Sequence, residues 1–104
     1  MAQEASFQYG IVISGDRELP QAQFEVNRAK KNKPPYPNTY LFYRSRWYRG
    51  LVLFKTKKEA DSALPTISKQ IRKGSYIVKL NEWCPGWQSF PVRKNNTVSF
   101  YRCT

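Results

Sequence analysis

The stretch RWYRGLVLFKTKKEA, residues 46–60, decides the fold because it contains a strand that runs directly into a helix. The alternation from Trp47 to Lys55 is typical of a β-strand. Thr56 and Glu59 then have the spacing of a capping box, in which each side chain satisfies a backbone N–H at the start of a helix. Apolar residues follow at helical spacing: Ala60, Ala63, Leu64, Ile67 and Ile71. We therefore predict a strand over 47–55 and a helix that begins near residue 57.

The chain before this stretch contains a strand, a helix and a second strand. Alternating apolar residues predict a strand over 7–14, and a helix follows from about Pro20, since proline suits a first helical turn. The inward stripe of that helix is Leu19, Ala22, Val26 and Ala29. Residues 39–44 form the next strand, and the short connection at 45–46 predicts a hairpin with the strand over 47–55.

The chain after this stretch contains one more strand of the core and a tail. Pro65 removes a backbone donor, so we expect a kink in the second helix or two short helices there. Gly74 is expected to end that helix, and residues 75–83 form the fourth strand. The tail after Cys84 is expected to form an extra hairpin that turns at residues 94–96.

The resulting order is β-α-β-β-α-β, which indicates an α+β, ferredoxin-like fold. We expect a four-stranded antiparallel sheet with both helices on one face and a C-terminal hairpin-like extension. A length of 104 residues fits a single domain over residues 1–104, with a core at 7–83 and an extension at 84–104 that packs on the core. The other sheet face stays open unless that extension covers it.

The charge of the chain favours an acidic partner. The formal net charge is +11, and residues 27–104 contain 17 of the 18 basic groups. Such an imbalance favours a polyanion such as nucleic acid, or an acidic protein surface. The expected basic patch comprises Lys30, Lys31, Lys33, Lys55, Lys57 and Lys58.

The residue types present argue against an enzyme. The sequence has no histidine, no pair of carboxylates at a useful spacing and no glycine-rich phosphate loop. We therefore expect no catalytic residues, no cofactor and no metal site. Cys84 and Cys103 are expected to be free, although a bridge between them stays open for an oxidising compartment. Neither a signal peptide nor an apolar membrane-spanning run is visible, so the expected location is the cytoplasm, or the cell envelope if the sequence is a trimmed piece, with no membrane partner.

The third strand also invites comparison with RNA-binding domains that share the β-α-β-β-α-β order. Their signature starts with a basic residue and glycine, as Arg49 and Gly50 do here, and continues with aromatic residues that stack on bases. In this chain those positions become Arg49 and Leu51, and leucine offers no π-face for stacking. Nucleic-acid binding through this strand therefore stays an alternative.

Several short motifs, in their order and spacing, resemble the SPOR (sporulation-related repeat) domain. The first is Tyr9-Gly-Ile-Val-Ile-Ser-Gly-Asp16, and the third strand contributes Trp47-Tyr48-Arg49 and then Phe54-x-Thr56-x-x-Glu59-Ala60. Ser75-Tyr-Ile-Val78 and Trp83-Cys84-Pro85 complete the likeness, which covers residues 7–85 and is greatest to bacterial SPOR-like versions that end in Trp-Cys-Pro.

The resemblance implies a ferredoxin-like binding module whose usual ligand is a peptidoglycan glycan strand without stem peptides. The implied ligand surface is the open sheet face, and aromatic residues such as Trp47, Tyr48, Trp83 and Trp87 are candidates to stack on sugars or bases. The alternatives are a small basic nucleic-acid-binding domain and an adaptor or inhibitor that docks on an acidic protein, as a monomer or weak dimer. The expected ligand-binding residues are Gln8, Tyr43, Arg44, Arg46, Trp47, Arg49, Leu51 and Lys79.

Overall fold

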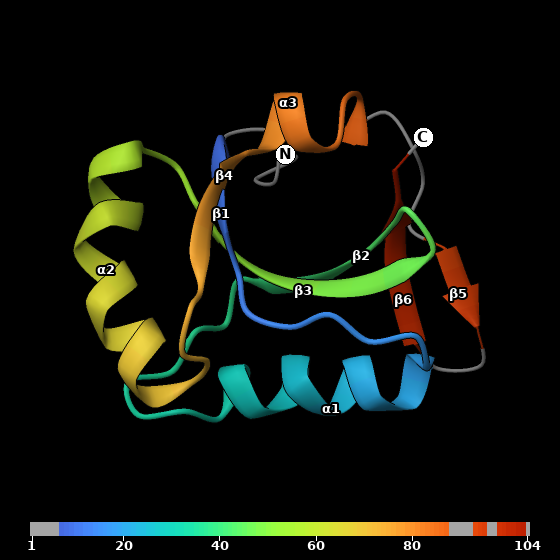
Figure 1. Ribbon diagram of the computed structural model, residues 1–104, viewed down its shortest axis with the longest axis horizontal. Coiled ribbons are helices and arrows are strands. Elements are labelled where there is room, and N and C mark those ends of the chain that lie inside the picture. The colour runs from blue at the N-terminus through green and yellow to red at the C-terminus, as the bar shows by residue number, and fades with distance from the viewer. Residues whose placement is uncertain (1–6, 88–92, 96–97, 104) are drawn as a thin grey trace.

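A computed structural model of the chain describes residues 7–87, 93–95 and 98–103 and shows a small α+β fold (Figure 1). The elements in chain order are β1 (Tyr9–Val12), α1 (Leu19–Lys30), β2 (Thr39–Arg44), β3 (Trp47–Phe54), α2 (Lys57–Gln70), β4 (Tyr76–Lys79), α3 (Leu80–Trp83), β5 (Arg93–Asn95) and β6 (Val98–Arg102). The predicted α+β class is thus confirmed.

The sheet is larger than the four antiparallel strands predicted from the sequence. Its strand order is β4-β1-β3-β2-β6-β5. The first four strands pair antiparallel, whereas β6 pairs with β2 in parallel, through Phe42 with Tyr101 and Tyr43 with Arg102. The sheet is therefore mixed. β5 and β6 form the expected antiparallel C-terminal hairpin. Lys94 and Asn95 were predicted in its turn but belong to β5, and Asn96 lies outside the described residues.

The two long helices form where the sequence patterns predict them. In α1 the proline lies in the first turn, and Ala22, Val26 and Ala29 form the buried stripe. In α2 the Glu59 amide donates to the Thr56 hydroxyl at 3.1 Å. The Glu59 carboxylate accepts from the backbone N–H of Lys55, one residue before the position expected for a capping box.

The end of α2 differs from the prediction in two respects. Pro65 lies within a single helix, so the expected division into two short helices is wrong. Proline removes only one helical hydrogen bond. Ala60, before Pro65, and Ile67, after it, are both completely buried, so both parts of the helix are held against the core. Gly74, with φ of +85°, lies in the turn before β4, whereas the helix is capped earlier, at Ile71.

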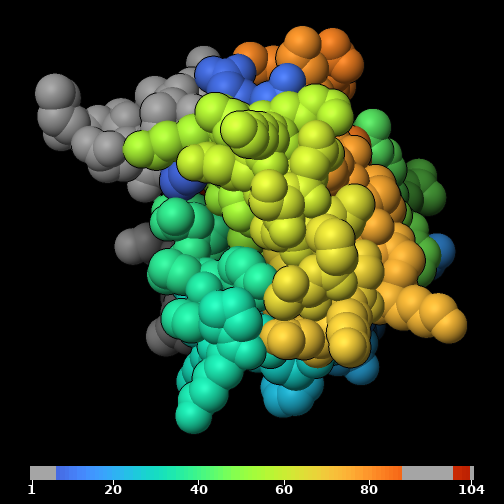
Figure 2. Space-filling view, turned by 90° about the vertical axis from the view of Figure 1, so that its left-hand side faces the viewer, coloured from blue at the N-terminus to red at the C-terminus, as the bar shows by residue number. Residues whose placement is uncertain are grey.

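One face of the sheet is covered by α1 and α2, as predicted. Figure 1 shows α1 below the sheet and α2 beside β1 and β4, and Figure 2 shows α2 as the outer surface of that side. Ile11 and Val52 lie in one core cluster with Ile67 of α2, and Leu41 lies with Val26 of α1 in another. We call this the helix face.

The opposite face, which we call the tail face, is not open. Residues 80–83 form the short helix α3, so the predicted strand over 75–83 is wrong beyond Lys79. α3 crosses this face because Leu80 packs against Leu51 and Leu53 in a fully apolar cluster. Trp87 fills the centre of the same cluster and is completely buried.

A disulfide fixes the tail over this face. Cys84, directly after α3, is bonded to Cys103, directly after β6, across 19 residues of sequence. The expectation that both cysteines are free is therefore wrong. The sequence separation of the two cysteines did not decide between free thiols and a bridge. In the structure, β6 pairs in parallel with β2, and this pairing brings Cys103 beside Cys84.

Within residues 7–87, 93–95 and 98–103, none of the helices combines the length and apolar character that a membrane span requires.

Candidate functional site: an arginine–tryptophan surface

The β2–β3 hairpin ends in a strained two-residue turn. Ser45 and Arg46 have φ values of 53° and 70°, which is the left-handed region that a tight hairpin of this kind requires. Glycine and asparagine are the usual residues there, because a side chain costs free energy in this conformation. Both side chains are exposed at the tip of the hairpin, so the turn displays an arginine at a cost in stability.

Beside the turn, the guanidinium groups of two arginines lie close to the ring of one tryptophan. The guanidinium carbon of Arg17 lies 4.7 Å from the ring centroid of Trp47, and that of Arg49 lies 5.8 Å from it. Arg17 reaches this position because Asp16 and Tyr48 exchange two backbone hydrogen bonds of 2.8 Å. Gly15 leaves room for the second arginine, since a Cβ there would lie 2.6 Å from Nη1 of Arg49.

A second arginine–tryptophan pair continues this surface toward α3. The Nε of Arg44 donates to the backbone oxygen of Trp83 at 2.7 Å, and its guanidinium carbon lies 5.0 Å from the Trp83 ring centroid. Stacking on the ring and bonding to the carbonyl fix the orientation of the guanidinium. We call the whole set the hairpin-end surface: Arg17, Arg44, Arg46, Trp47, Arg49 and Trp83.

The charge of the hairpin-end surface is not neutralised by the rest of the described chain. The ion pairs found among the described residues join Arg28 to Glu25, Lys57 to Asp61 and Lys79 to Glu82. None of the four arginines of the hairpin-end surface has a carboxylate partner there. Guanidinium donors not used within the chain are thus available to an external anion, and the half-buried tryptophan rings lie beside them.

The predicted ligand residues fall into two groups in the structure. Arg44, Trp47 and Arg49 lie together on the tail side of the β2–β3 hairpin, with Arg46 at its tip. The other group is spread over different parts of the fold. It comprises Gln8, Tyr43, Leu51 and Lys79.

Each residue of the scattered group has a different environment. Leu51 has no exposed surface, so its expected ligand contact is wrong. Tyr43 packs against Tyr48 and Phe100 on the helix side rather than beside Arg44. Gln8 and Lys79 are exposed at the far end of the sheet, where β1 pairs with β4.

The remaining aromatic and basic candidates are also separated. Trp87 was a stacking candidate, but its complete burial excludes contact with an external ligand. The lysines of the predicted basic patch are all exposed, three at the end of α1 and three at the start of α2. The sequence analysis did not include Arg17 in the site, because Arg17 is distant in sequence from the hairpin. The antiparallel pairing of β1 with β3 ends at Val12 and Leu51, and its continuation brings the residues after Val12 toward the start of β3.

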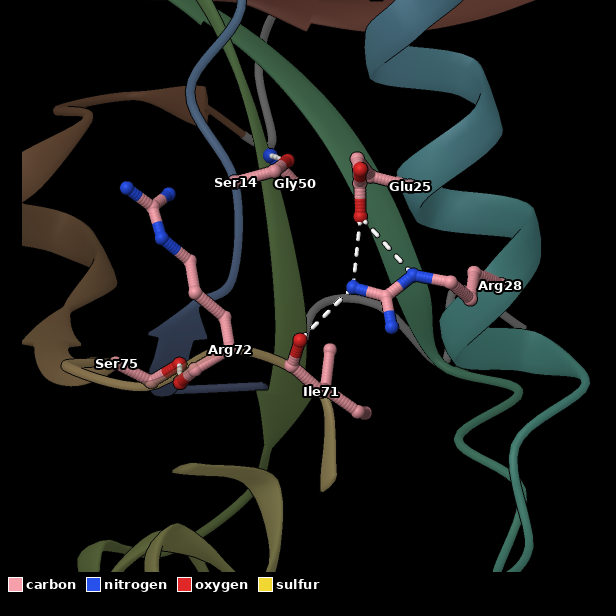
Figure 3. Close-up of polar contacts among 7 residues, drawn as sticks. All are labelled: Ser14, Glu25, Arg28, Gly50, Ile71, Arg72 and Ser75. Carbon is pink, nitrogen blue, oxygen red and sulfur yellow. Dashed lines mark hydrogen bonds and ion pairs between the residues drawn. The ribbon is translucent and has the colours of Figure 1, made fainter. Parts of the chain in front are cut away.

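A polar pocket on the helix face is the second place where charged groups meet. It has a volume of about 250 Å³ and lies between the β1–α1 connection, α1 and the end of α2. Figure 3 shows Arg28 bridging the Glu25 carboxylate, at 2.9 Å, and the Ile71 carbonyl, at 2.8 Å. Arg28 thus ties α1 to the end of α2, which is a structural role.

Asp16 at the rim of this pocket has a perturbed pKa. Burial raises the pKa of the Asp16 carboxyl above its ordinary value, and the negative charge of Glu25 raises it further, while Arg72 opposes both. Its Oδ2 is buried and has no hydrogen-bond partner among the residues that the structure describes. Among the residues that the structure describes, no group of three potential metal ligands exists here or elsewhere.

Comparison with known proteins does not assign the chain to a family. No family model matches it, and neither the curated proteins nor the solved structures contain a significant match. Function must therefore be inferred from the site itself.

Proposed function

We propose that this chain is a non-enzymatic, SPOR-like binding module with a ferredoxin-like core, and that it holds an anionic glycan strand of the bacterial cell wall on its hairpin-end surface. The observation that carries the proposal is the placement of the Arg17 and Arg49 guanidiniums over the Trp47 ring without a carboxylate partner in the described chain. The order β4-β1-β3-β2 within the sheet supports the ferredoxin-like part.

The chemistry of a peptidoglycan strand without stem peptides suits this surface. When an amidase removes a stem peptide, it leaves a free carboxylate on the sugar. Arginine binds a carboxylate through two parallel hydrogen bonds, and the apolar face of a sugar ring packs on an indole. The surface thus offers a partner for both the charge and the ring of each such sugar.

The disulfide favours an extracytoplasmic ligand. Disulfide bonds persist in oxidising compartments and are rare in the reducing cytoplasm. The Cys84–Cys103 bond therefore supports a place in the cell envelope rather than the cytoplasm. A cell-wall polymer is present there.

Co-sedimentation with purified cell-wall sacculi tests the proposal. The protein should pellet with sacculi, and amidase treatment of the sacculi should increase the bound fraction. The double variant Arg17→Gln/Arg49→Gln should lose about tenfold or more in affinity, because two charge-assisted contacts disappear. Lys58→Gln/Lys69→Gln is the matched control, since it removes the same charge from exposed positions on α2. Equal loss in both variants, or no pelleting, refutes the glycan proposal.

Nucleic acid is the second candidate, because the net charge of +11 and the half-buried Trp47 ring also suit phosphates and bases. A labelled single-stranded oligonucleotide should then be retarded in a gel, with an affinity that falls steeply between about 50 and 200 mM salt. Retardation that depends on Trp47, together with failure to bind sacculi, would favour this candidate over the glycan.

A further inference from the structure

A second surface lies on α1, on the opposite side of the sheet from α3 (Figure 1). Phe24 is 64% exposed and lies on the solvent side of α1, opposite the buried Ala22, Val26 and Ala29. Single exposed apolar residues are common, so the aromatic ring alone does not define a site. The surroundings of the ring supply the further observations.

Phe24 separates two open hollows along the solvent side of α1. The hollow toward the start of the helix has a volume of about 490 Å³ and is lined by Asp16, Pro20, Gln21, Phe24 and Glu25. The hollow toward the end of the helix has a volume of about 530 Å³ and is lined by Phe24, Asn27, Arg28, Lys31, Asn32 and Lys33. The phenyl ring is thus accessible from both sides, as an apolar anchor point in a groove would be.

The two hollows have opposite charge. Asp16 and Glu25 line the first, whereas the second is lined by cations and amides and by no carboxylate. In the second hollow, Arg28 is bonded to Glu25 and to the Ile71 carbonyl. Asn32 is also engaged, since its amide donates to Pro34 and Gln70.

The lysines of the second hollow are the groups left to bind a partner. Lys31 and Lys33 are exposed and make no ion pair within the described chain. Their spacing from Phe24 places Lys31 two helical turns further along the same side of the helix, with Asn27 and Arg28 between them. An apolar ring and two free cations therefore lie along one groove.

From this arrangement we infer that the groove along α1 docks an acidic segment of a partner protein, with one apolar side chain on Phe24 and carboxylates on Lys31 and Lys33. The acidic first hollow disfavours a uniformly negative polymer, because Asp16 and Glu25 would repel it. The same charge separation fixes the direction in which the segment lies. Since this groove and the hairpin-end surface lie on different sides of the molecule, the chain can join an acidic protein to a second ligand.

The inference is tested on the isotope-labelled full chain by NMR titration with synthetic peptides. The probe is a peptide in which one leucine has alternating glutamate and serine on one side and serine alone on the other, so that no glutamate has to lie against Asp16 and Glu25. The backbone signals of Phe24, Lys31 and Lys33 should shift on titration. Two matched peptides, one with glutamine for every glutamate and one with serine for the leucine, should each bind at least about tenfold more weakly.

Variants of the protein supply the complementary control. Phe24→Ser should weaken binding of the acidic peptide by about tenfold or more, whereas Tyr76→Ser, at another exposed aromatic residue, should leave it unchanged. Lys31→Gln/Lys33→Gln should weaken binding more than Lys58→Gln/Lys69→Gln. The inference is overturned if no signals on α1 shift, if the neutral peptide or an oligonucleotide binds the groove equally well, or if Phe24→Ser has no effect. Because sacculi are not used, failure here leaves the glycan proposal standing.

Discussion

Two parts of the tail face belong to the same strand, β3, but have opposite roles. At the start of β3, Trp47 and Arg49 point to the tail side and remain accessible. Further along the same side, Leu51 and Leu53 are buried beneath α3 and Trp87. Along this side of β3, the residue type changes from tryptophan and arginine to leucine where the part covered by α3 and Trp87 begins. Alternation along a strand therefore identifies a face, and the residue types along that face show which part is covered.

The difference implies that the covered part supplies stability and the accessible part supplies binding. In the covered part, Trp87 contacts Phe42 and Tyr101 at ring-centroid distances of 5.8 and 5.1 Å. In the accessible part, arginine stacks on tryptophan at a comparable distance, but the pair remains in contact with solvent. Substitutions in the two parts should therefore change different measured quantities.

The largest effect is expected for Trp87→Ala. It should lower the free energy of unfolding by about 3–5 kcal/mol, because a completely buried ring is removed from the tail-face core. Trp87→Phe should cost less, since the indole N–H has no hydrogen-bond partner among the described residues. Urea unfolding measures both values. A Trp87→Ala variant that is as stable as the wild type but no longer binds its ligand would reverse the assigned roles.

Removal of the disulfide should have the next largest effect. Cys84→Ser/Cys103→Ser should lower the free energy of unfolding by about 2–4 kcal/mol, because the bond closes a loop across 19 residues. Ligand affinity at a temperature where the variant is folded should not change. If affinity rises instead, the covered part of the tail face contains a ligand site that the tail normally blocks.

The strained turn offers a substitution in which stability and binding move in opposite directions. Arg46→Gly should raise the free energy of unfolding by about 1 kcal/mol, because glycine adopts a φ of 70° without steric cost. It should also weaken ligand binding, because an exposed guanidinium is lost. Ser45→Gly is the matched control and should stabilise the protein without a change in affinity. Equal affinities for both variants would exclude Arg46 from the binding surface.

The smallest effect concerns Asp16. Its folded-state pKa is raised above the ordinary 3.8, mainly by burial, so the folded state holds the proton more tightly than the unfolded state. Stability should accordingly be highest below the ordinary pKa and fall as the pH rises through the raised value. Asp16→Asn should lack this part of the pH dependence, whereas Glu18→Gln, at an exposed neighbour, should retain it. Thermal unfolding at pH 3 to 7 measures the difference, and parallel curves for wild type and Asp16→Asn would contradict it.

Much of the fold was predictable, because its signals are local. The stripe of α1, the cap of α2 at Thr56 and the β2–β3 hairpin each depend on residues a few positions apart. The short helix α3 was not predictable in the same way. Residues 75–83 were predicted as one strand, whereas the chain turns at Leu80, which is buried in one cluster with Leu51.

The candidate site was predictable only where it is contiguous in sequence. Arg44, Arg46, Trp47 and Arg49 are all on one hairpin, and the structure leaves them accessible together. Arg17 joins them through the backbone contact between Asp16 and Tyr48, which is a long-range pairing. The residues that cover the tail face belong to α3 and the tail, which the disulfide fixes in place. The expected ligand contact of Leu51 was therefore wrong because of residues far from β3 in sequence.

The most direct measurement of the central claim uses the indole N–H signals of the three tryptophans. They report on the hairpin-end surface (Trp47 and Trp83) and on the covered core (Trp87). Titration of the labelled protein with amidase-treated glycan strands should shift the Trp47 signal most, move that of Trp83 less, and leave that of Trp87 unchanged. A titration in which the Trp87 signal shifts while Trp47 stays fixed would contradict the account.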